Sequence, residues 1–313
     1  MANKNTNLCN ARTAKNDEFY TQLSDIENEM AHYKDFFKGK IVYCNCDDAR
    51  ESNFFKFFSN NFESLGLKKL ITTGYKENGK GVKLVYEGDK NGNFMVDDAE
   101  VVVTELEGSG DFRSEECIEL LKECDVVVTN PPFSLFREYV AQLMKHGKKF
   151  LIVGPMNAVT YKEIFPYIKN NELWLGQNAK GGTRKGNSLS FATPNGENKD
   201  VSSWWFTNIM CQRRNTPIDL YKKYSEDEYP KYDNYNAIEC GKSHLIPMDY
   251  DGVIGAPISF LMFHCPTQFE IVDAREVALN DKQRNKSTYL IKDADGAING
   301  KPTYARICIR RKK

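Results

Sequence analysis

The sequence predicts a doubly wound α/β fold, and two observations predict it. Short runs of β-branched and other apolar residues recur between residues 40 and 155, and amphipathic helical patterns separate them. The 313 residues are 41% hydrophobic, which is enough to fill one large core or two modest ones. A mostly parallel sheet with helices on both faces accommodates this alternation.

A polar tail and a helix come first. Residues 1–16 show no periodicity, so we expect a flexible tail. From Ser24, apolar residues recur every three or four positions, which predicts an amphipathic helix that ends near Gly39.

The next segments predict a strand, a helix and a strand. KIVYCNC at 40–46 and KKLITTGY at 68–75 have the composition of short buried strands. Between them, phenylalanines share one helical face, and Gly66 is a suitable stop. This order is typical of a parallel sheet.

Residues 79–105 interrupt the alternation. Two alternating runs flank a DKNG turn, which predicts a hairpin inserted at the edge of the sheet. The pattern then resumes with a helix over 114–124, a strand over 125–129, a helix that Ser134 can cap, and a strand over 148–155.

Beyond about residue 176 the helical patterns disappear. This part is basic and glycine-rich at 179–186, basic again at 306–313, and interleaves tyrosines with charges elsewhere. We therefore expect the main core over 17–175, and strands and loops over 176–313 that complete the core and cover its rim.

Composition excludes several classes of protein. Lysine plus arginine balance aspartate plus glutamate at 43 each, which argues against a generic nucleic-acid coat but allows a local basic groove. The cysteines and histidines show no spacing typical of zinc ligands, so we expect reduced thiols and no metal site. The absence of an apolar signal segment or a long apolar run favours a cytoplasmic protein that crosses no membrane.

The strand end DVVVTNPPF, residues 125–133, is the strongest functional signal. Ligands of open α/β sheets bind beyond the carboxyl ends of the strands. Pro131 and Pro132 fix the backbone and have no N–H, so rigid carbonyls point outward. Asn130 adds a side-chain acceptor and Phe133 a flat ring. These groups suit a planar amine, and a purely structural double-proline turn is the alternative.

The exocyclic amine of adenine is such an amine, and its lone pair is delocalised into the ring. The Asn130 side-chain oxygen and the Pro131 carbonyl would accept hydrogen bonds from its two N–H groups. The lone pair would then be free to attack a methyl donor. Phe133 would stack on the base, which must leave the duplex first. Positioning and electrostatics would supply the rate without a metal.

These residues also carry a family resemblance. TNPPF at 129–133 resembles the catalytic motif of amino-group DNA methyltransferases, and DEFYTQ at 17–22 resembles their upstream cofactor segment. Segments from residue 17 to about 261, in the family's order, resemble the EcoRI-type adenine-specific DNA methyltransferases: DIENE, VYCNCDD, SNFFKFF, NFESLGLKKLI, GDFRS, VVVTNPPFSLFREY, TYKEIF, YPKYDNYNAI and GVIGAPISFL.

The resemblance implies a Rossmann-like methyltransferase core, S-adenosylmethionine as methyl donor, and N6-methylation of adenine in a short sequence of duplex DNA. It implies that Asn130, Pro131, Pro132 and Phe133 handle the base, and that 176–313 includes the target-recognition region. The implied cofactor residues are Tyr20 and Thr21 at the methionine part and Asp111 and Phe112 at the adenine. Where the sequence departs from the family, the candidates are Asn45, Cys46 and Asp47 in the first loop and Tyr75 after the second strand.

Two features depart from the family pattern. CNCDDARES at 44–52 replaces the usual glycine-rich first loop, and the second strand ends in TTGYKEN, which leaves Tyr75 or Glu77 for the ribose hydroxyls. The segment 176–203 matches the family least, which leaves the target sequence open.

Other functions and partners remain open at this stage. An RNA adenine or protein glutamine methyltransferase would also use an NPP-aromatic motif, and the glycine-free first loop also suits a DNA-binding protein that lost its cofactor. The resemblance implies a bacterial or phage protein of restriction-modification or of orphan or phage modification. A restriction endonuclease is then a candidate functional partner without a stable complex, and we expect a monomer.

Overall fold

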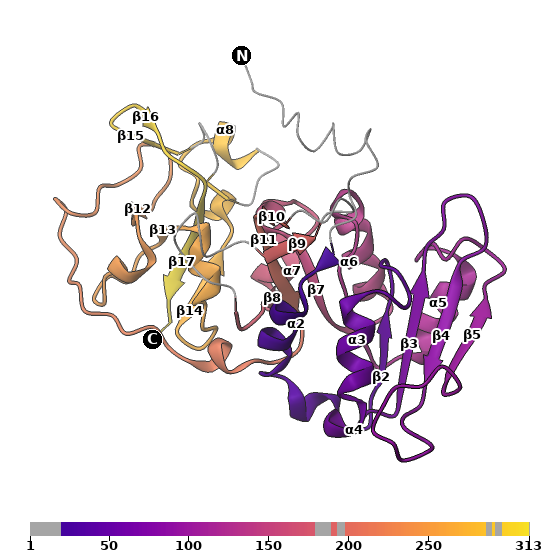
Figure 1. Ribbon diagram of the computed structural model, residues 1–313. Helices are drawn as coiled ribbons and strands as arrows, with labels where there is room; N and C mark the ends of the chain where they lie inside the picture. The colour runs from indigo at the N-terminus through magenta and orange to yellow at the C-terminus, as the bar shows by residue number, and fades with distance from the viewer. Residues whose placement is uncertain (1–19, 179–188, 193–197, 286–289, 292–295, 313) are drawn as a thin grey trace. The chain divides into compact units, whose positions relative to one another are not determined.

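The computed structural model describes residues 20–178, 189–192, 198–285, 290–291 and 296–312, and the chain divides into two compact units (Figure 1). Unit 1 comprises Met1–Met156, Gly176–Ala179 and Thr183–Ile209. Unit 2 comprises Asn157–Leu175, Lys180–Gly182 and Met210–Lys313. The expected tail 1–16 and the basic segment 179–186 lie outside the described residues.

Unit 1 is built on a sheet whose strands follow the order β5-β4-β3-β2-β6-β7-β11. These strands are β2 (Ile41–Cys44), β3 (Lys69–Gly74), β4 (Val82–Tyr86), β5 (Val101–Glu105), β6 (Val126–Thr129), β7 (Lys149–Pro155) and β11 (Ser203–Thr207). β3, β2, β6 and β7 pair in parallel, whereas β4 and β5 form the predicted edge hairpin and β11 runs antiparallel to β7. The predicted doubly wound, mostly parallel sheet is confirmed.

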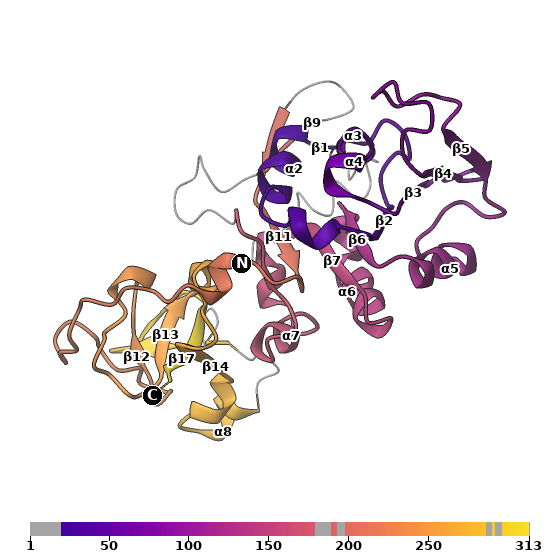
Figure 2. The same cartoon turned by 90° about the horizontal axis from the view of Figure 1, so that it is seen from below.

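Helices lie on both faces of this sheet. They are α2 (Leu23–Met30), η1 (Lys34–Phe37), α3 (Asn53–Asn60), α4 (Phe62–Leu65), α5 (Glu115–Glu123), η2 (Phe133–Leu135) and α6 (Phe136–Lys145). Figure 2 shows α3 and α4 on one face and α5 and α6 on the other. Ser52 and Ser114 cap α3 and α5 by accepting the backbone N–H of Phe54 and Cys117, so each helix starts directly after a short polar turn.

The pairing of β11 explains why the unit boundaries differ from the expected division after residue 175. Strand β11 comes late in the chain but pairs along its whole length with β7, so 183–209 belongs to unit 1. Residues 157–175, which we expected in the core, belong instead to unit 2.

The predicted helix over 24–39 is interrupted. Helix α2 ends at Met30, and the chain leaves the helical conformation before η1 begins. Tyr33 lies at the interruption, and its hydroxyl donates to the Glu29 carboxylate (2.9 Å). The interruption therefore places a polar partner beside a buried acid, which periodicity alone does not reveal.

Glu29 gives the stability of unit 1 a pH dependence. Its buried carboxylate accepts the backbone N–H groups of Gln177 (2.6 Å) and Asn178 (2.8 Å) as well as the Tyr33 hydroxyl. Burial raises the pKa of Glu29 above its ordinary value of 4.5, and these hydrogen bonds lower the pKa only in part.

The raised pKa means that folding favours the protonated form of Glu29. Its contribution to stability is complete below pH 4.5 and is lost as the pH rises through the raised pKa. We expect the free energy of unfolding to fall over this range, and Glu29→Gln to flatten the fall because an amide does not titrate. Urea unfolding at several pH values measures the slope, with the exposed Glu27→Gln on the same helix as control. Equal slopes in the two variants would contradict the assignment.

A second, small sheet of unit 1 holds the segment that precedes α2. Strand β1 (Tyr20–Thr21) pairs antiparallel with β9 (Leu189–Ala192), which pairs antiparallel with β10 (Asn198–Val201). The predicted cofactor segment is thus tied to the part of the chain that follows residue 188.

Unit 2 has its own sheet, in the order β12-β13-β17-β14. Its elements are α7 (Phe165–Lys169), β8 (Trp174–Leu175), η4 (Gln212–Asn215), β12 (Ile238–Glu239), η5 (Ser243–Leu245), β13 (Ile254–Pro257), η6 (Ile258–Met262), β14 (Phe269–Val272), η7 (Ala274–Val277), α8 (Asp281–Arg284), β15 (Ala297–Ile298), β16 (Lys301–Pro302) and β17 (Arg306–Arg311), while η3 (Met156–Thr160) spans the boundary between the units. Most of the basic segment 306–313 is therefore the strand β17, not a tail. Within the described residues, the helices lack the length and apolarity needed to cross a membrane.

Candidate active site

The carboxyl ends of β2 and β6 bring two asparagines together. The strands are adjacent and parallel, with Tyr43 opposite Val127, so the residues after each strand leave the same edge of the sheet. Asn45 follows β2 and Asn130 follows β6, and both are buried. The Thr129 hydroxyl joins the two strand ends by donating to the Asn45 carbonyl oxygen.

The NPPF segment turns sharply after β6. Pro132 has an extended backbone, and its carbonyl accepts the N–H of Leu135 (2.9 Å), which closes the 3₁₀ turn η2. Ser134 lies inside this turn, and Leu135 occupies the position before α6, so the prediction that Ser134 caps the helix was wrong. Pro131 is buried and Phe133 half-buried at the start of η2.

Asn45 is held in a fixed orientation. Its side-chain oxygen accepts the Tyr139 hydroxyl and the Cys46 thiol, and Tyr139 is itself 2% exposed. The amide N–H groups of Asn45 are therefore the donors it can offer to a ligand. A buried polar side chain with defined partners is well suited to bind a cofactor at one position.

Cys46 performs the turn that a glycine performs in other first loops. Its φ is +68°, in the left-handed region that disfavours most residues with a side chain. Burial is the main cause that raises the pKa values of Cys44 and Cys46 well above their ordinary value, so both thiols are protonated and unreactive at neutral pH. The glycine-free loop thus reaches a glycine-like conformation.

Asp111 lies on a loop that packs against the end of β3. The Ser109 carbonyl accepts the N–H of Lys76 (2.8 Å), and Gly110 has a φ of +81°. The Arg113 guanidinium donates to both carboxylate oxygens of Asp111 and lowers the pKa of Asp111, which keeps the acid ionised. An ionised carboxylate can accept a hydrogen bond from the amine of an adenine.

Phe112 packs against Tyr139, the residue whose hydroxyl bonds Asn45, and so connects the Asp111 loop with Asn45. Its ring is 6% exposed and packs edge-on against Tyr139, with 4.9 Å between the ring centroids. Gln142 donates to the Phe112 carbonyl (2.9 Å). Tyr139 therefore supports Asn45 through its hydroxyl and Phe112 through its ring.

Thr21 is tied to the helix that follows the first loop. Asn53, the first residue of α3, donates to the Thr21 carbonyl (2.8 Å). Thr21 is 1% exposed, and its hydroxyl has no hydrogen-bond partner among the described residues. A buried hydroxyl of this kind fits a polar ligand. Tyr20 lies in β1, and its side chain is outside the described part of the structure.

Tyr75 and Asp47 occupy the edges of this group. Tyr75 directly follows β3 and is 51% exposed. Asp47 is half-buried in the first loop, where its carboxylate accepts the N–H of Asp48 (3.0 Å). Both remain predictions as cofactor residues.

Four supporting residues were not predicted from the sequence: Thr129, Tyr139, Asn53 and Arg113. Tyr139 lies on the apolar face of a predicted helix, and Thr129 directly precedes the motif, so each had a positional signal. Their contacts connect residues far apart in the chain, which local patterns do not encode. Among the described residues, no three His, Cys, Asp or Glu side chains form a group able to hold a metal ion.

The groups present fit S-adenosylmethionine. The unpaired Thr21 hydroxyl, the amide donors of Asn45 and the ionised Asp111 supply the acceptor and donor set that an amino acid, a ribose and an adenine require.

Comparison with known proteins identifies the family. The family model described as "Adenine-specific methyltransferase EcoRI" matches residues 7–312. The type II methyltransferase M.EcoRI of Escherichia coli is 43% identical over 343 residues, with 100% of this chain and 99% of that protein covered. The type II methyltransferase M.MgeORF184P of Mycoplasma genitalium is 38% identical, with 97% and 98% covered, and M.MpnI of Mycoplasma pneumoniae is 36% identical, with 97% of each covered. The chain belongs to the EcoRI family of adenine-specific methyltransferases.

Proposed function

We propose that this protein transfers a methyl group from S-adenosylmethionine to the N6 amine of an adenine in a short sequence of duplex DNA. The observation that carries the proposal is the placement of Asn130 and Pro131 at the end of β6, beside the end of β2 where Asn45 begins the first loop. Family membership and relatives named as type II methyltransferases support it.

The base-handling groups act on the lone pair of the amine. The Asn130 side-chain oxygen and the Pro131 carbonyl accept the two N–H groups of N6, which favours a tetrahedral nitrogen. The Pro132 carbonyl already accepts the backbone N–H of Leu135. Pro131 is therefore the proline whose carbonyl accepts a hydrogen bond from the substrate. Phe133 stacks on the adenine after it leaves the duplex.

The cofactor supplies an electrophilic methyl group on a sulfonium when bound. Thr21, with Tyr20, would contact its methionine part, Asn45, Cys46 and Asp47 would contact it from the first loop, and Tyr75 would approach the ribose. The Asp111 carboxylate would accept a hydrogen bond from the adenine amine of the cofactor, and Phe112 would pack behind this carboxylate. The new N–C bond replaces the S–C bond, and N6 loses one proton to solvent.

The remaining assignments concern partners. We propose that unit 2, together with the segment 179–186, contacts the target DNA. In β17, Arg306 is held by Glu239, so we propose that the more exposed Arg310 and Arg311 exchange their partners Glu270 and Asp251 for phosphates. We further propose a cytoplasmic monomer whose functional partner is a restriction endonuclease of the same specificity.

Transfer of radiolabelled methyl groups tests the function. The protein is incubated with labelled S-adenosylmethionine and, separately, with mixed-sequence duplex DNA, RNA and a protein mixture. We expect label in DNA, recovered as N6-methyladenine, in one sequence context. Label only in RNA or protein, or none with any substrate, would refute the proposal.

A further inference from the structure

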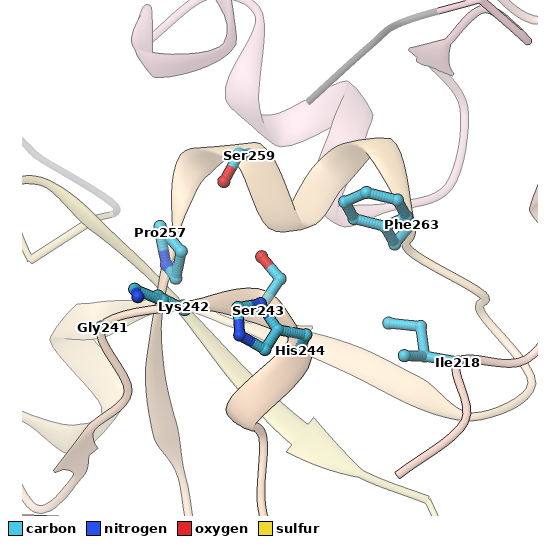
Figure 3. Close-up of a pocket in the computed structure, with 8 residues that line it drawn as sticks. All are labelled: Ile218, Gly241, Lys242, Ser243, His244, Pro257, Ser259 and Phe263. Atoms are coloured by element: carbon cyan, nitrogen blue, oxygen red, sulfur yellow. The ribbon is translucent and has the colours of Figure 1, made fainter. Parts of the chain in front are cut away.

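Unit 2 contains a cavity that no assigned residue of the active site lines. Its volume is about 540 Å³, within the range of roughly 300–1,000 Å³ typical of small-ligand sites. Figure 3 shows Ser243 and His244 of η5 on one side, Ser259 and Phe263 of the η6 region above, and Ile218 opposite the serines. The cavity thus lies between two 3₁₀ helices and the chain that precedes β12.

The wall at Ile218 is held in place by the side-chain amide of Gln268. Gln268 accepts the N–H of Ile218 (2.8 Å) and donates to its carbonyl (2.8 Å). At the other apolar wall, the N–H of Phe263 bonds the carbonyl of Phe260 (2.8 Å), a fully buried residue. These two walls are therefore formed before any ligand binds.

The polar wall is held equally well. The N–H of Leu245 bonds the Lys242 carbonyl (3.0 Å), which closes η5 around Ser243 and His244. The Tyr229 hydroxyl donates to the Leu245 carbonyl (2.7 Å). These two hydrogen bonds hold the backbone of the turn that carries Ser243 and His244.

The cavity is lined by both polar and apolar residues. The polar lining residues are Lys242, Ser243, His244 and Ser259, and the apolar ones include Ile218 and the 42% exposed Phe263. The residues that line the cavity include no carboxylate, and Lys242 contributes one positive charge. The Ser243 hydroxyl oxygen is buried and has no hydrogen-bond partner among the described residues.

We propose that this cavity binds one unstacked nucleotide of the DNA substrate, with its base between Ile218 and Phe263 and its phosphate at Lys242 and His244. A planar ring joined to an anion matches the apolar and basic residues of the lining, and the half-buried Ser259 adds a hydroxyl that a sugar or a base edge can bond. The proposal rests on DNA as the substrate. It adds a second base-holding site, separate from Asn130, that anchors the duplex while the target adenine is extruded.

Binding of isolated nucleotides tests the cavity without catalysis. The full-length protein is titrated with each 2′-deoxynucleoside 5′-monophosphate, with the matching nucleosides and with inorganic phosphate, and NMR of the ligand reports binding. We expect monophosphates to bind more tightly than nucleosides or phosphate alone. Phe263→Ala should weaken them by roughly 5- to 150-fold because a stacking partner is lost.

Variants separate this site from the rest of the surface. Lys242→Ala should reduce the preference for monophosphate over nucleoside, whereas Lys301→Ala and the exposed Tyr304→Ala in the same unit should leave nucleotide binding unchanged. With duplex DNA, Phe263→Ala and Lys242→Ala should raise the KM and leave the S-adenosylmethionine Kd as in wild type.

The outcomes distinguish this proposal from the proposed function. If the wild type methylates DNA but no monophosphate binds, or all four variants behave alike, the cavity proposal is overturned and the function stands. Nucleotide binding with an unchanged KM for DNA would assign the cavity to free nucleotides and also overturn it. Binding of phosphate as strong as that of monophosphates would reduce it to an anion site, against the proposal. Failure of the wild type to methylate DNA would refute the function, whatever the titrations show.

Discussion

Replacing Asn130 by alanine is expected to lower the kcat of methyl transfer by roughly 10²–10³-fold and to leave the Kd of S-adenosylmethionine unchanged. The side-chain oxygen of Asn130 is the acceptor that holds one N–H of the target amine, and this contact strengthens as N6 becomes tetrahedral. Interactions that strengthen only in the transition state act on kcat rather than on binding.

Single-turnover kinetics with saturating DNA and cofactor measure this effect directly. Asn60→Ala, an exposed asparagine at the end of α3, serves as the matched control and should retain wild-type turnover. Because Asn130 is 9% exposed, the thermal unfolding of the variant must also be recorded. Wild-type turnover in a folded Asn130→Ala protein would remove Asn130 from the base-handling site.

The sequence predicted the parts of the fold that rest on local patterns. The βαβ units and the edge hairpin follow from apolar periodicity, and the structure confirms them in β2 to β7. The break after Met30 was not predicted, and the buried Glu29 beside it has the partners Gln177 and Asn178, which lie far along the chain. The assignment of 183–209 to unit 1 likewise depends on strand pairing over a long separation.

In the candidate site, too, features within consecutive residues were predicted and contacts between distant residues were not. The motif at Asn130 was visible because its chemistry is contained in consecutive residues. The support of Asn45 by Tyr139 was not, because it joins the loop after β2 to the helix after β6. Cys46 is the clearest case: the first loop has no glycine in the sequence, yet the positive φ of Cys46 gives the backbone a conformation that favours glycine.

Gly110 is the glycine for which we expect the largest loss of stability. Its φ is +81°, and a Cβ at this position would lie 2.5 Å from the carbonyl oxygen of Gly74 at the end of β3. Gly81 faces the same loop, and its own Cβ would meet the Gly110 nitrogen at 2.7 Å. Two glycines thus allow the Asp111 loop to approach the sheet, and a side chain on Gly110 would push the loop away.

Gly110→Ala combines two costs, and Gly92→Ala isolates one of them. Gly92 has a φ of +77° with nothing within 4 Å of its would-be Cβ, so its substitution costs only the left-handed conformation, about 1–2 kcal/mol. Gly110→Ala adds overpacking against backbone, for a total of about 2–5 kcal/mol. Urea unfolding measures both values.

The same pair of variants tests whether the Asp111 loop serves the cofactor. At a temperature where both proteins are folded, Gly110→Ala should weaken S-adenosylmethionine binding by at least roughly tenfold, since loss of one hydrogen bond to a charged group costs about 1.5–3 kcal/mol. Gly92→Ala should bind it as the wild type does, because Gly92 lies in the connection between β4 and β5. Equal destabilisation by the two variants would refute the close approach at Gly74. A normal cofactor Kd in a destabilised Gly110→Ala protein would instead separate the loop's structural role from cofactor binding and remove Asp111 from the site.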